Sequence, residues 1–213
     1  MPSFKNGVLL LYNFSLFVSH AVIFVDVLHS GVKERLKDFE YGKLFPLLVI
    51  ITAIQYLDII LFLLSFTKSN PIAVFTQVTG RIFVLYVATH VVGWTLAVYS
   101  LVFVYILSEL CRGPYYITNC LGEPSPVLAF LRYNAFKLLY PIGFMCEALV
   151  FANVYYQSYK KGAFISSTGT DYSPYIAISF LIFFGFIVRF LFGTMSRQAA
   201  SKRKLWEEES KSE

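Results

Sequence analysis

The sequence predicts an all-α protein, a polytopic membrane bundle of about six transmembrane helices. Of its 213 residues, 57% are hydrophobic and only 15% are charged, whereas soluble domains average roughly 45–50% apolar and about 25% charged residues. The apolar residues also gather into stretches near the length of about 20 residues that a helix needs to cross a hydrocarbon core roughly 30 Å thick. We expect one membrane domain, residues 1–198, followed by a charged cytosolic tail, residues 199–213.

Six apolar stretches are separated by breaks that contain Lys, Pro or Gly, and they cover residues 7–29, 44–66, 72–90, 93–110, 131–156 and 173–195. The third and fourth belong to one apolar run, residues 72–108. As a single helix this run would be roughly 54 Å long, which is much longer than a membrane requires. We therefore place a break near Gly93.

The chain ends and the longest break complete the predicted topology. The first stretch is longer than the apolar core of a signal peptide and contains His20 and Asp26, so we expect it to remain as a span. An even number of spans places both termini on one side, and the basic tail, with Arg197 and Lys202 among its cations, favours the cytosol by the positive-inside rule. Segment 111–127 is rich in Pro and Gly and predicts a cytosolic loop.

Charge and motif content exclude several classes of function. The formal net charge is +5, with its excess in short loops and the tail, so the sequence predicts no basic face of the size that nucleic acid needs. Cys111, Cys120 and Cys146 have neither CxxC spacing nor an Arg six positions later, which argues for free thiols and against a zinc site or a cysteine phosphatase. GxSxG, Walker and GxGxxG motifs do not occur. We expect no metal and no cofactor.

The clearest candidates for chemistry are Tyr140 and Glu147 in the fifth stretch. A step of seven residues returns to within about 20° of the same helix face, about 10.5 Å further along the axis. Pro141 deprives the carbonyl of Lys137 of its helical partner, and Gly143 removes a side chain from the same turn. A phenol and a carboxyl group on this opened face could share proton transfer. The alternative is an interfacial aromatic and a hydrogen-bonded packing group.

Other ionisable groups lie at membrane depth and need partners there. Asp58 in the second stretch could orient a site, or it could pair with Arg81 of the third stretch, which is the favoured interpretation. The remaining groups are interpreted as satisfied interior or interfacial residues without the spacing of a metal site. They are Asp26, His20, His29 and His90.

The fifth stretch carries a resemblance to a known family. Leu131-Arg132-Tyr133 followed by Tyr140-Pro141-Ile142-Gly143 and Glu147 resembles the 3-hydroxyacyl-CoA dehydratases, also called protein tyrosine phosphatase-like proteins. Weaker matches follow in order over most of the chain, at Tyr12-Asn13, Ser69-Asn70-Pro71, Gln77-Val78, Arg81, Trp94 and the basic end of the sixth stretch.

The resemblance implies six spans in the endoplasmic reticulum and the third step of very-long-chain fatty-acid elongation. In that step a (3R)-3-hydroxyacyl-CoA loses water to give a trans-2-enoyl-CoA. The resemblance also implies Tyr140 and Glu147 as the catalytic pair. We expect Glu147 to be the base and Tyr140 the proton donor, although the sequence does not fix the direction. The expected partners are long-chain 3-hydroxyacyl-CoA and membrane lipid, with an elongase and an enoyl-CoA reductase as candidate protein partners.

Substrate binding is assigned to basic, aromatic and small residues near the pair. We expect the acyl tail in the bundle interior and the CoA phosphates near the cytosolic face, where Arg132, Lys137 or Arg112 could meet them. Snorkelling at the interface is the alternative for Arg132 and Lys137. The full candidate set is Arg132, Tyr133, Lys137, Gly143, Asp58 and Arg81.

The chain also departs from the family pattern in ways that remove polar groups. The family's Glu and His of the second span appear as Asp58 and Leu61, and the acidic and basic residues expected after Trp94 appear as Val98 and Leu101. Further departures are Ser19-His20 for Gly-Trp and Gly80 for Ser. Both a divergent active dehydratase and a noncatalytic membrane scaffold that binds elongation enzymes or lipid therefore stay open. A small transporter is the third hypothesis, although no inverted repeat is evident.

Overall fold

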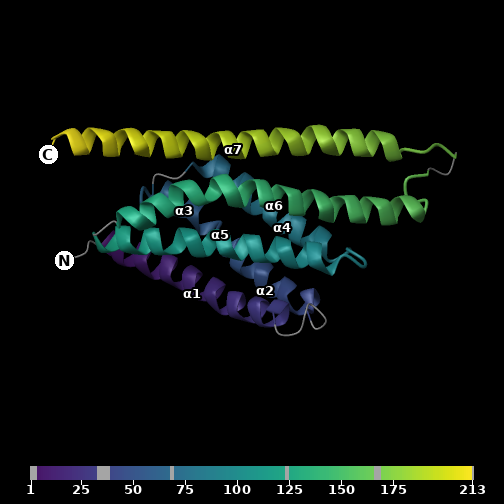
Figure 1. Ribbon diagram of the computed structural model, residues 1–213, viewed down its shortest axis with the longest axis horizontal. Helices are drawn as coiled ribbons and strands as arrows, with labels where there is room; N and C mark the ends of the chain where they lie inside the picture. Colours follow the sequence, from purple (N-terminus) through teal and green to yellow (C-terminus); the bar gives the residue numbers. More distant parts are fainter. Residues whose placement is uncertain (1–3, 33–38, 68–69, 123–124, 166–168, 213) are drawn as a thin grey trace. The chain divides into compact units, whose positions relative to one another are not determined.

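The computed structural model describes residues 4–32, 39–67, 70–122, 125–165 and 169–212, with side chains described up to residue 201 except at 136, 198 and 199. The described residues form seven helices joined by short connections, and their β-structure is one isolated bridge between Ile165 and Asp171 (Figure 1). The helices are α1 (Phe4–Val32), α2 (Tyr41–Ile54), α3 (Leu57–Leu63), α4 (Pro71–Ala88), α5 (Thr95–Leu121), α6 (Pro126–Lys160) and α7 (Ser173–Ser212).

Six segments of the described chain are long and apolar enough to cross a membrane, with α2 and α3 together forming one of them. Their bounds are Phe4–Gly31, Tyr41–Leu63, Pro71–Ala88, Thr95–Leu121, Pro126–Lys160 and Ser173–Arg197. The prediction of an all-α membrane bundle with six spans is therefore confirmed. The side chains of the tail cations Lys202, Arg203, Lys204 and Lys211 lie outside the described part of the chain.

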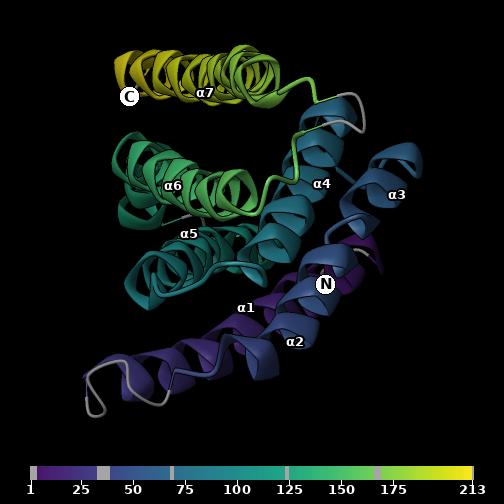
Figure 2. The ribbon, with the colours of Figure 1, turned by 90° about the vertical axis from the view of Figure 1, so that its right-hand side faces the viewer.

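Residues 1–154 form one compact unit and residues 155–213 form a second. In the first unit α1 packs along α5, while α2 and α3 pack against α4 (Figures 1 and 2). The core of this unit is apolar and is best buried at Val27, Leu85, Leu101, Val102 and Val150. Large apolar side chains also cover the outer faces, as expected where lipid is the solvent.

Local chemistry explains where α4 and α5 begin and end. Asn70 caps α4, since its Oδ1 accepts hydrogen bonds from the backbone N–H groups of Ile72 at 3.0 Å and Ala73 at 3.4 Å, and Pro71 supplies the favoured first residue. Gly93 lies between α4 and α5 with a φ of 75°, a conformation that glycine adopts without steric cost. The predicted break near Gly93 is therefore confirmed.

The predicted loop over residues 111–127 is wrong. Helix α5 continues through Pro114 to Leu121 and ends at Gly122, whose φ is 87°, while α6 already begins at Pro126. Proline inside a membrane helix is tolerated where neighbouring groups satisfy the opened backbone, and α5 continues here although Pro114 leaves the carbonyl of Leu110 without its helical donor. Close packing of Gly113 on Phe17 of α1 also holds this segment in the bundle.

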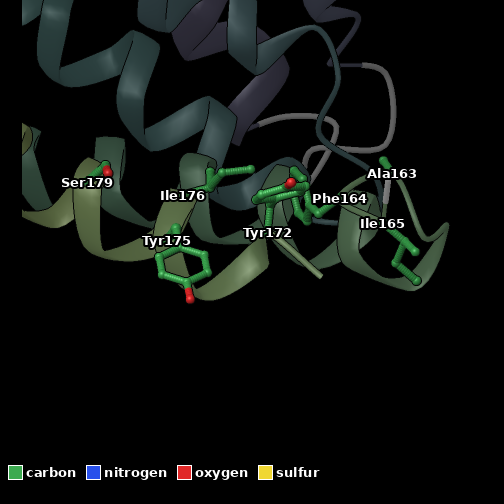
Figure 3. Close-up of a pocket in the computed structure, with 7 residues that line it drawn as sticks. All are labelled: Ala163, Phe164, Ile165, Tyr172, Tyr175, Ile176 and Ser179. Atoms are coloured by element: carbon green, nitrogen blue, oxygen red, sulfur yellow. The ribbon is translucent and has the colours of Figure 1, made fainter. Parts of the chain in front are cut away.

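The second unit contains the end of α6, a connecting segment and α7. Tyr155 Oη donates to the carbonyl of Ser173 at 3.0 Å, and its ring stacks on Phe164 with 5.3 Å between ring centroids. Asp171 Oδ1 accepts a hydrogen bond from the N–H of Ser173 at 2.8 Å, next to the start of α7. Within this unit a pocket of about 580 Å³ is lined by residues that include Phe164, Tyr172 and Ser179 (Figure 3).

Candidate active site

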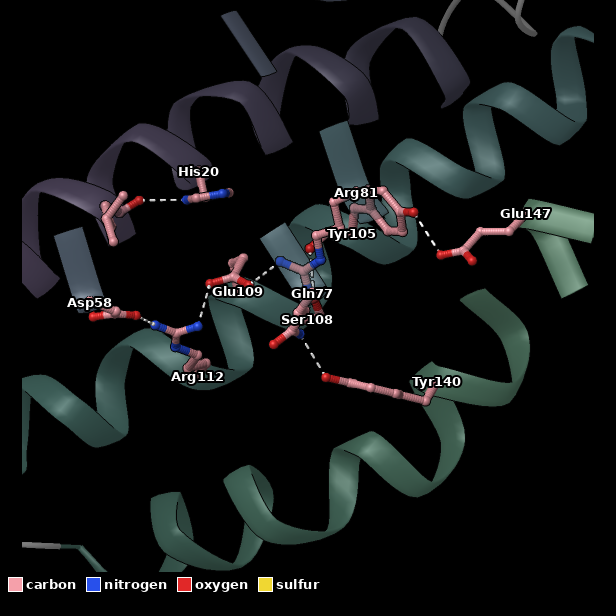
Figure 4. Close-up of polar contacts among 11 residues, drawn as sticks. His20, Asp58, Gln77, Arg81, Tyr105, Ser108, Glu109, Arg112, Tyr140 and Glu147 are labelled. Atoms are coloured by element: carbon pink, nitrogen blue, oxygen red, sulfur yellow. Dashed lines mark hydrogen bonds and ion pairs between the residues drawn. The ribbon is translucent and has the colours of Figure 1, made fainter. Parts of the chain in front are cut away.

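Tyr140 and Glu147 both project from α6 toward α4 and α5 (Figure 4). Tyr140 Oη accepts a hydrogen bond from Gln77 Nε2 of α4 at 2.7 Å. Glu147 Oε1 accepts one from Tyr105 Oη of α5, also at 2.7 Å. The two residues that the sequence selected are therefore directed into the interior of the bundle, and each contacts a side chain of a different neighbouring helix.

The backbone of α6 between them contains Pro141 and Gly143 but remains helical. A Cβ added to Gly143 would meet only Val104 Cγ1, at 3.6 Å, which is an ordinary van der Waals contact. Packing against α5 therefore does not demand glycine at this position. The expected role of Gly143 in substrate binding stays a prediction.

An ion pair joins α4 to α5 beside these residues. Arg81 Nη1 lies 2.5 Å from Glu109 Oε1, and the two side chains are only 11% and 8% exposed. Arg81 Nη2 also donates to Ser108 Oγ at 3.1 Å, and its guanidinium group lies 5.3 Å from the centre of the Tyr105 ring. Arg81 thus contacts the same α5 tyrosine that holds Glu147.

A second ion pair extends the network to α3. Arg112 Nη2 donates to Asp58 Oδ2 at 2.8 Å, while Arg112 Nη1 lies 3.7 Å from Glu109 Oε2. Glu109 is therefore shared by two arginines. Buried charges are costly unless they are paired, and here two guanidinium groups face two carboxylates. The result is a connected cluster of charged residues, Asp58, Arg81, Glu109 and Arg112, inside a largely apolar unit.

The predicted pairing of Asp58 with Arg81 is wrong, because each of them pairs with a residue of α5 instead. Glu109 was not among the predicted residues, and the family's acidic and basic residues after Trp94 appear in this chain as Val98 and Leu101, which are buried apolar core. The structure has a Glu and an Arg with the same spacing of three residues further along α5. The sequence does contain a signal for this Glu and Arg, because they are two opposite charges three positions apart at the end of an apolar stretch.

Arg112 was also a candidate contact for phosphate, but its ion pairs with Asp58 and Glu109 occupy it in the interior. Arg132 lies over the rings of Tyr116 and Tyr133, at 5.6 Å and 5.9 Å from their centres, and its Nη2 donates to Tyr116 Oη at 3.3 Å. Tyr133 Oη lies 3.5 Å from Tyr115 Oη. These aromatic residues hold Arg132 near the start of α6.

Lys137 differs from Arg132 because its side chain is exposed. Lys137 Nζ donates to Asn134 Oδ1 at 2.9 Å, one turn earlier on α6. An exposed ammonium group on a flexible stem can reorient toward a phosphate without losing a buried contact.

The other polar candidates lie apart from this cluster or are satisfied locally. His20 is buried and its Nδ1 lies 2.7 Å from the carbonyl oxygen of Leu16. His90 is exposed, with its Nδ1 3.0 Å from Thr89 Oγ1. The three cysteines are free thiols, as expected from their spacing.

This arrangement can support acid–base chemistry. A phenol oxygen can accept one hydrogen bond and still donate its own proton, and a carboxylate can accept several hydrogen bonds. Gln77 and Tyr105 act as donors to Tyr140 and Glu147, respectively. The guanidinium groups of Arg81 and Arg132 also lie within electrostatic range of the Tyr140 phenol.

Residues 52–205 match the model of a family described as protein tyrosine phosphatase-like protein, PTPLA. A very-long-chain (3R)-3-hydroxyacyl-CoA dehydratase of Gallus gallus is 27% identical over 193 residues, which cover 88% of this chain and 53% of that protein. Very-long-chain (3R)-3-hydroxyacyl-CoA dehydratase 3 of Bos taurus is 25% identical over 155 residues, covering 70% of this chain and 42% of that protein.

A probable very-long-chain (3R)-3-hydroxyacyl-CoA dehydratase of Schizosaccharomyces pombe is 31% identical over 87 residues, which cover 39% of this chain and 42% of that protein. The chain spans about half the length of the curated relatives that it matches. No solved structure matches the chain significantly.

Proposed function

The chain belongs to the protein tyrosine phosphatase-like (PTPLA) family, and we propose that it is a very-long-chain (3R)-3-hydroxyacyl-CoA dehydratase acting in the third step of fatty-acid elongation. The names of its relatives support the reaction class. The single observation that carries the proposal is the common direction of Tyr140 and Glu147, which both reach the polar interior between α4 and α5.

The reaction needs a base for the hydrogen on C2, a proton for the departing hydroxyl on C3, and stabilisation of negative charge on the thioester oxygen. In our proposal the Glu147 carboxylate takes the C2 hydrogen and the Tyr140 hydroxyl protonates the leaving group, so that water and a trans-2-enoyl-CoA form. The resulting Tyr140 phenolate would be stabilised by the hydrogen bond from Gln77 and by the charge of Arg81. Proton return from Glu147 to Tyr140 completes the cycle.

Substrate would lie along α6 in this proposal. The acyl tail occupies the apolar interior, and Lys137 and Arg132 bind the CoA phosphates near the start of the helix. Tyr133 supports Arg132 through the aromatic contacts described above. Gly143 lies beside the substrate, and Asp58 and Arg81 act through the ion-pair cluster.

We also propose a location in the endoplasmic reticulum membrane, with residues 1–198 as the membrane domain and residues 199–213 as a tail on the cytosolic side with both termini. Six apolar segments support a multi-pass arrangement. An elongase and an enoyl-CoA reductase would be neighbours, because the elongase acts earlier in the same elongation cycle and the reductase consumes the enoyl-CoA product.

The alternative is a noncatalytic scaffold of the same family. Its motivation is the loss of interior polar residues at Val98 and Leu101. The ion pairs of Glu109 and Arg112 supply polar groups to the same helix, which weakens that motivation.

The two functions are separated by incubating purified protein with a long-chain (3R)-3-hydroxyacyl-CoA and following the enoyl-CoA product. The (3S) enantiomer serves as the control. Turnover of the (3R) form is expected, whereas no turnover combined with co-purification of an elongase would favour the scaffold.

A further inference from the structure

The orientation of Tyr140 and Glu147 depends on more than their own helix. Pro141 follows Tyr140 directly and leaves the carbonyl of Lys137 without its helical hydrogen bond, although α6 remains helical through this turn. The Tyr140 ring contacts Phe144 on α6 itself, and hydrogen bonds from α4 and α5 reach the two reactive groups through Gln77 and Tyr105.

The Tyr105 side chain has two contacts of its own. Its hydroxyl donates to Glu147 Oε1 at 2.7 Å, and its ring lies 5.3 Å from the Arg81 guanidinium. Arg81 is held in turn by its ion pair with Glu109. The Tyr105 side chain is therefore placed by a neighbour that is itself paired.

Gln77 of α4 contacts Tyr140 in the way that Tyr105 of α5 contacts Glu147. It lies four residues before Arg81, so the two side chains share a helix face, and its Nε2 donates to Tyr140 Oη at 2.7 Å. Helix α4 thus presents a donor to the phenol and a guanidinium group to Tyr105 from one face. Figure 4 shows these side chains gathered between α6 and the ion-pair cluster.

We propose that Gln77 and Tyr105 are positioning residues, with Gln77 orienting the Tyr140 hydroxyl and Tyr105 orienting the Glu147 carboxylate. This inference rests on the proposed dehydratase function. It assigns each reactive group a donor from a different neighbouring helix, so that its orientation does not depend on α6 alone. Misplacement of a reactive group by about 1 Å can cost a factor of 100 in rate.

The test uses Tyr105→Phe, which removes only the hydroxyl, and Gln77→Met, which keeps the length but removes the donor. Each is expected to lower kcat roughly 10- to 100-fold with little change in KM. Tyr99→Phe on α5 and Gln157→Met on α6 are the matched controls and should retain the wild-type kcat. Thermal unfolding of each purified variant checks that it is folded. The results for the Tyr105 variant and for the Gln77 variant are interpreted separately.

Double variants separate positioning from a general structural role. Residues that act through one another are not additive, so Tyr105→Phe should cost little more once Glu147→Gln is present, and Gln77→Met little more once Tyr140→Phe is present. Additive losses, or a full kcat in both single variants, would overturn the inference while wild-type turnover preserves the proposed function. Absence of turnover in the wild type overturns both.

Discussion

Arg81 of α4 and Glu109 of α5 form an ion pair of 2.5 Å between side chains that are almost fully buried. The sequence had favoured Asp58 as the partner of Arg81, but Asp58 bonds to Arg112 at 2.8 Å. One ion pair therefore joins α4 to α5 and the other joins α3 to α5. Glu109 connects the two pairs because it also lies near Arg112. This cluster is the main polar structure of the first unit and lies beside the proposed catalytic pair.

The pairing pattern predicts the outcome of two double-mutant cycles on protein in detergent. Arg81→Met with Glu109→Leu should show a coupling free energy of about 1–3 kcal/mol, because these groups touch. Arg81→Met with Asp58→Leu should show a much smaller coupling. The measurement is the free energy of unfolding of each single and double variant. A larger coupling for the Arg81 and Asp58 cycle would contradict the observed pairing.

The close approach of α1 and α5 predicts a steric effect at Gly113. A Cβ added there would lie 2.8 Å from Cδ2 and 3.1 Å from Cβ of Phe17, so the Phe17 side chain or the two helices must shift. Gly113→Ala should lower the free energy of unfolding by about 1–3 kcal/mol, as measured by thermal or denaturant unfolding.

Gly80→Ala on α4 is the matched control, because an added Cβ there meets nothing within 4 Å. Alanine favours a helix over glycine by up to about 1 kcal/mol, so this variant should be as stable as the wild type or more stable. Equal losses at Gly113 and Gly80 would argue against the packing of α1 on α5 described above.

Lys137 allows a direct test of phosphate binding. Lys137→Gln should raise KM for the CoA thioester roughly 1.5- to 5-fold with kcat unchanged, since one exposed charge contributes about 0.2–1 kcal/mol. The same variant should match the wild type on a 3-hydroxyacyl-pantetheine, which lacks the CoA phosphates. Lys160→Gln at the far end of α6 is the control. An equal rise in KM on both substrates would exclude a phosphate contact.

Hydropathy predicted most of the fold because the hydrocarbon core of a membrane accepts only apolar segments whose backbone is hydrogen-bonded internally. A chain that crosses a membrane must satisfy its backbone internally, in helices or in a closed barrel, and each of the six apolar stretches corresponds to one helical span, although the fourth extends to Leu121. The break near Gly93 was predicted correctly because a single helix over residues 72–108 would be much longer than a membrane requires. The loop predicted around Pro114 was wrong because proline usually marks a loop in a soluble protein, whereas a packed membrane helix tolerates it.

The site could be predicted only where its residues lie on one helix. Tyr140 and Glu147 share a face of α6 through a spacing that is visible in the sequence. Their partners Gln77 and Tyr105, and the ion pairs of Glu109 and Arg112, depend on which helices pack together. These contacts join residues that lie 28 to 63 positions apart in the chain, and no local pattern specifies them.

The central claim is that the Tyr140 phenol and the Glu147 carboxyl group carry out the proton transfers of dehydration. Its most direct test is the kcat of Tyr140→Phe and Glu147→Gln on a long-chain (3R)-3-hydroxyacyl-CoA, with Tyr156→Phe and Glu40→Gln as exposed controls. We predict a loss of roughly 10²–10⁴-fold for each site variant and none for the controls. Wild-type turnover by a protein that carries both site substitutions would contradict the account.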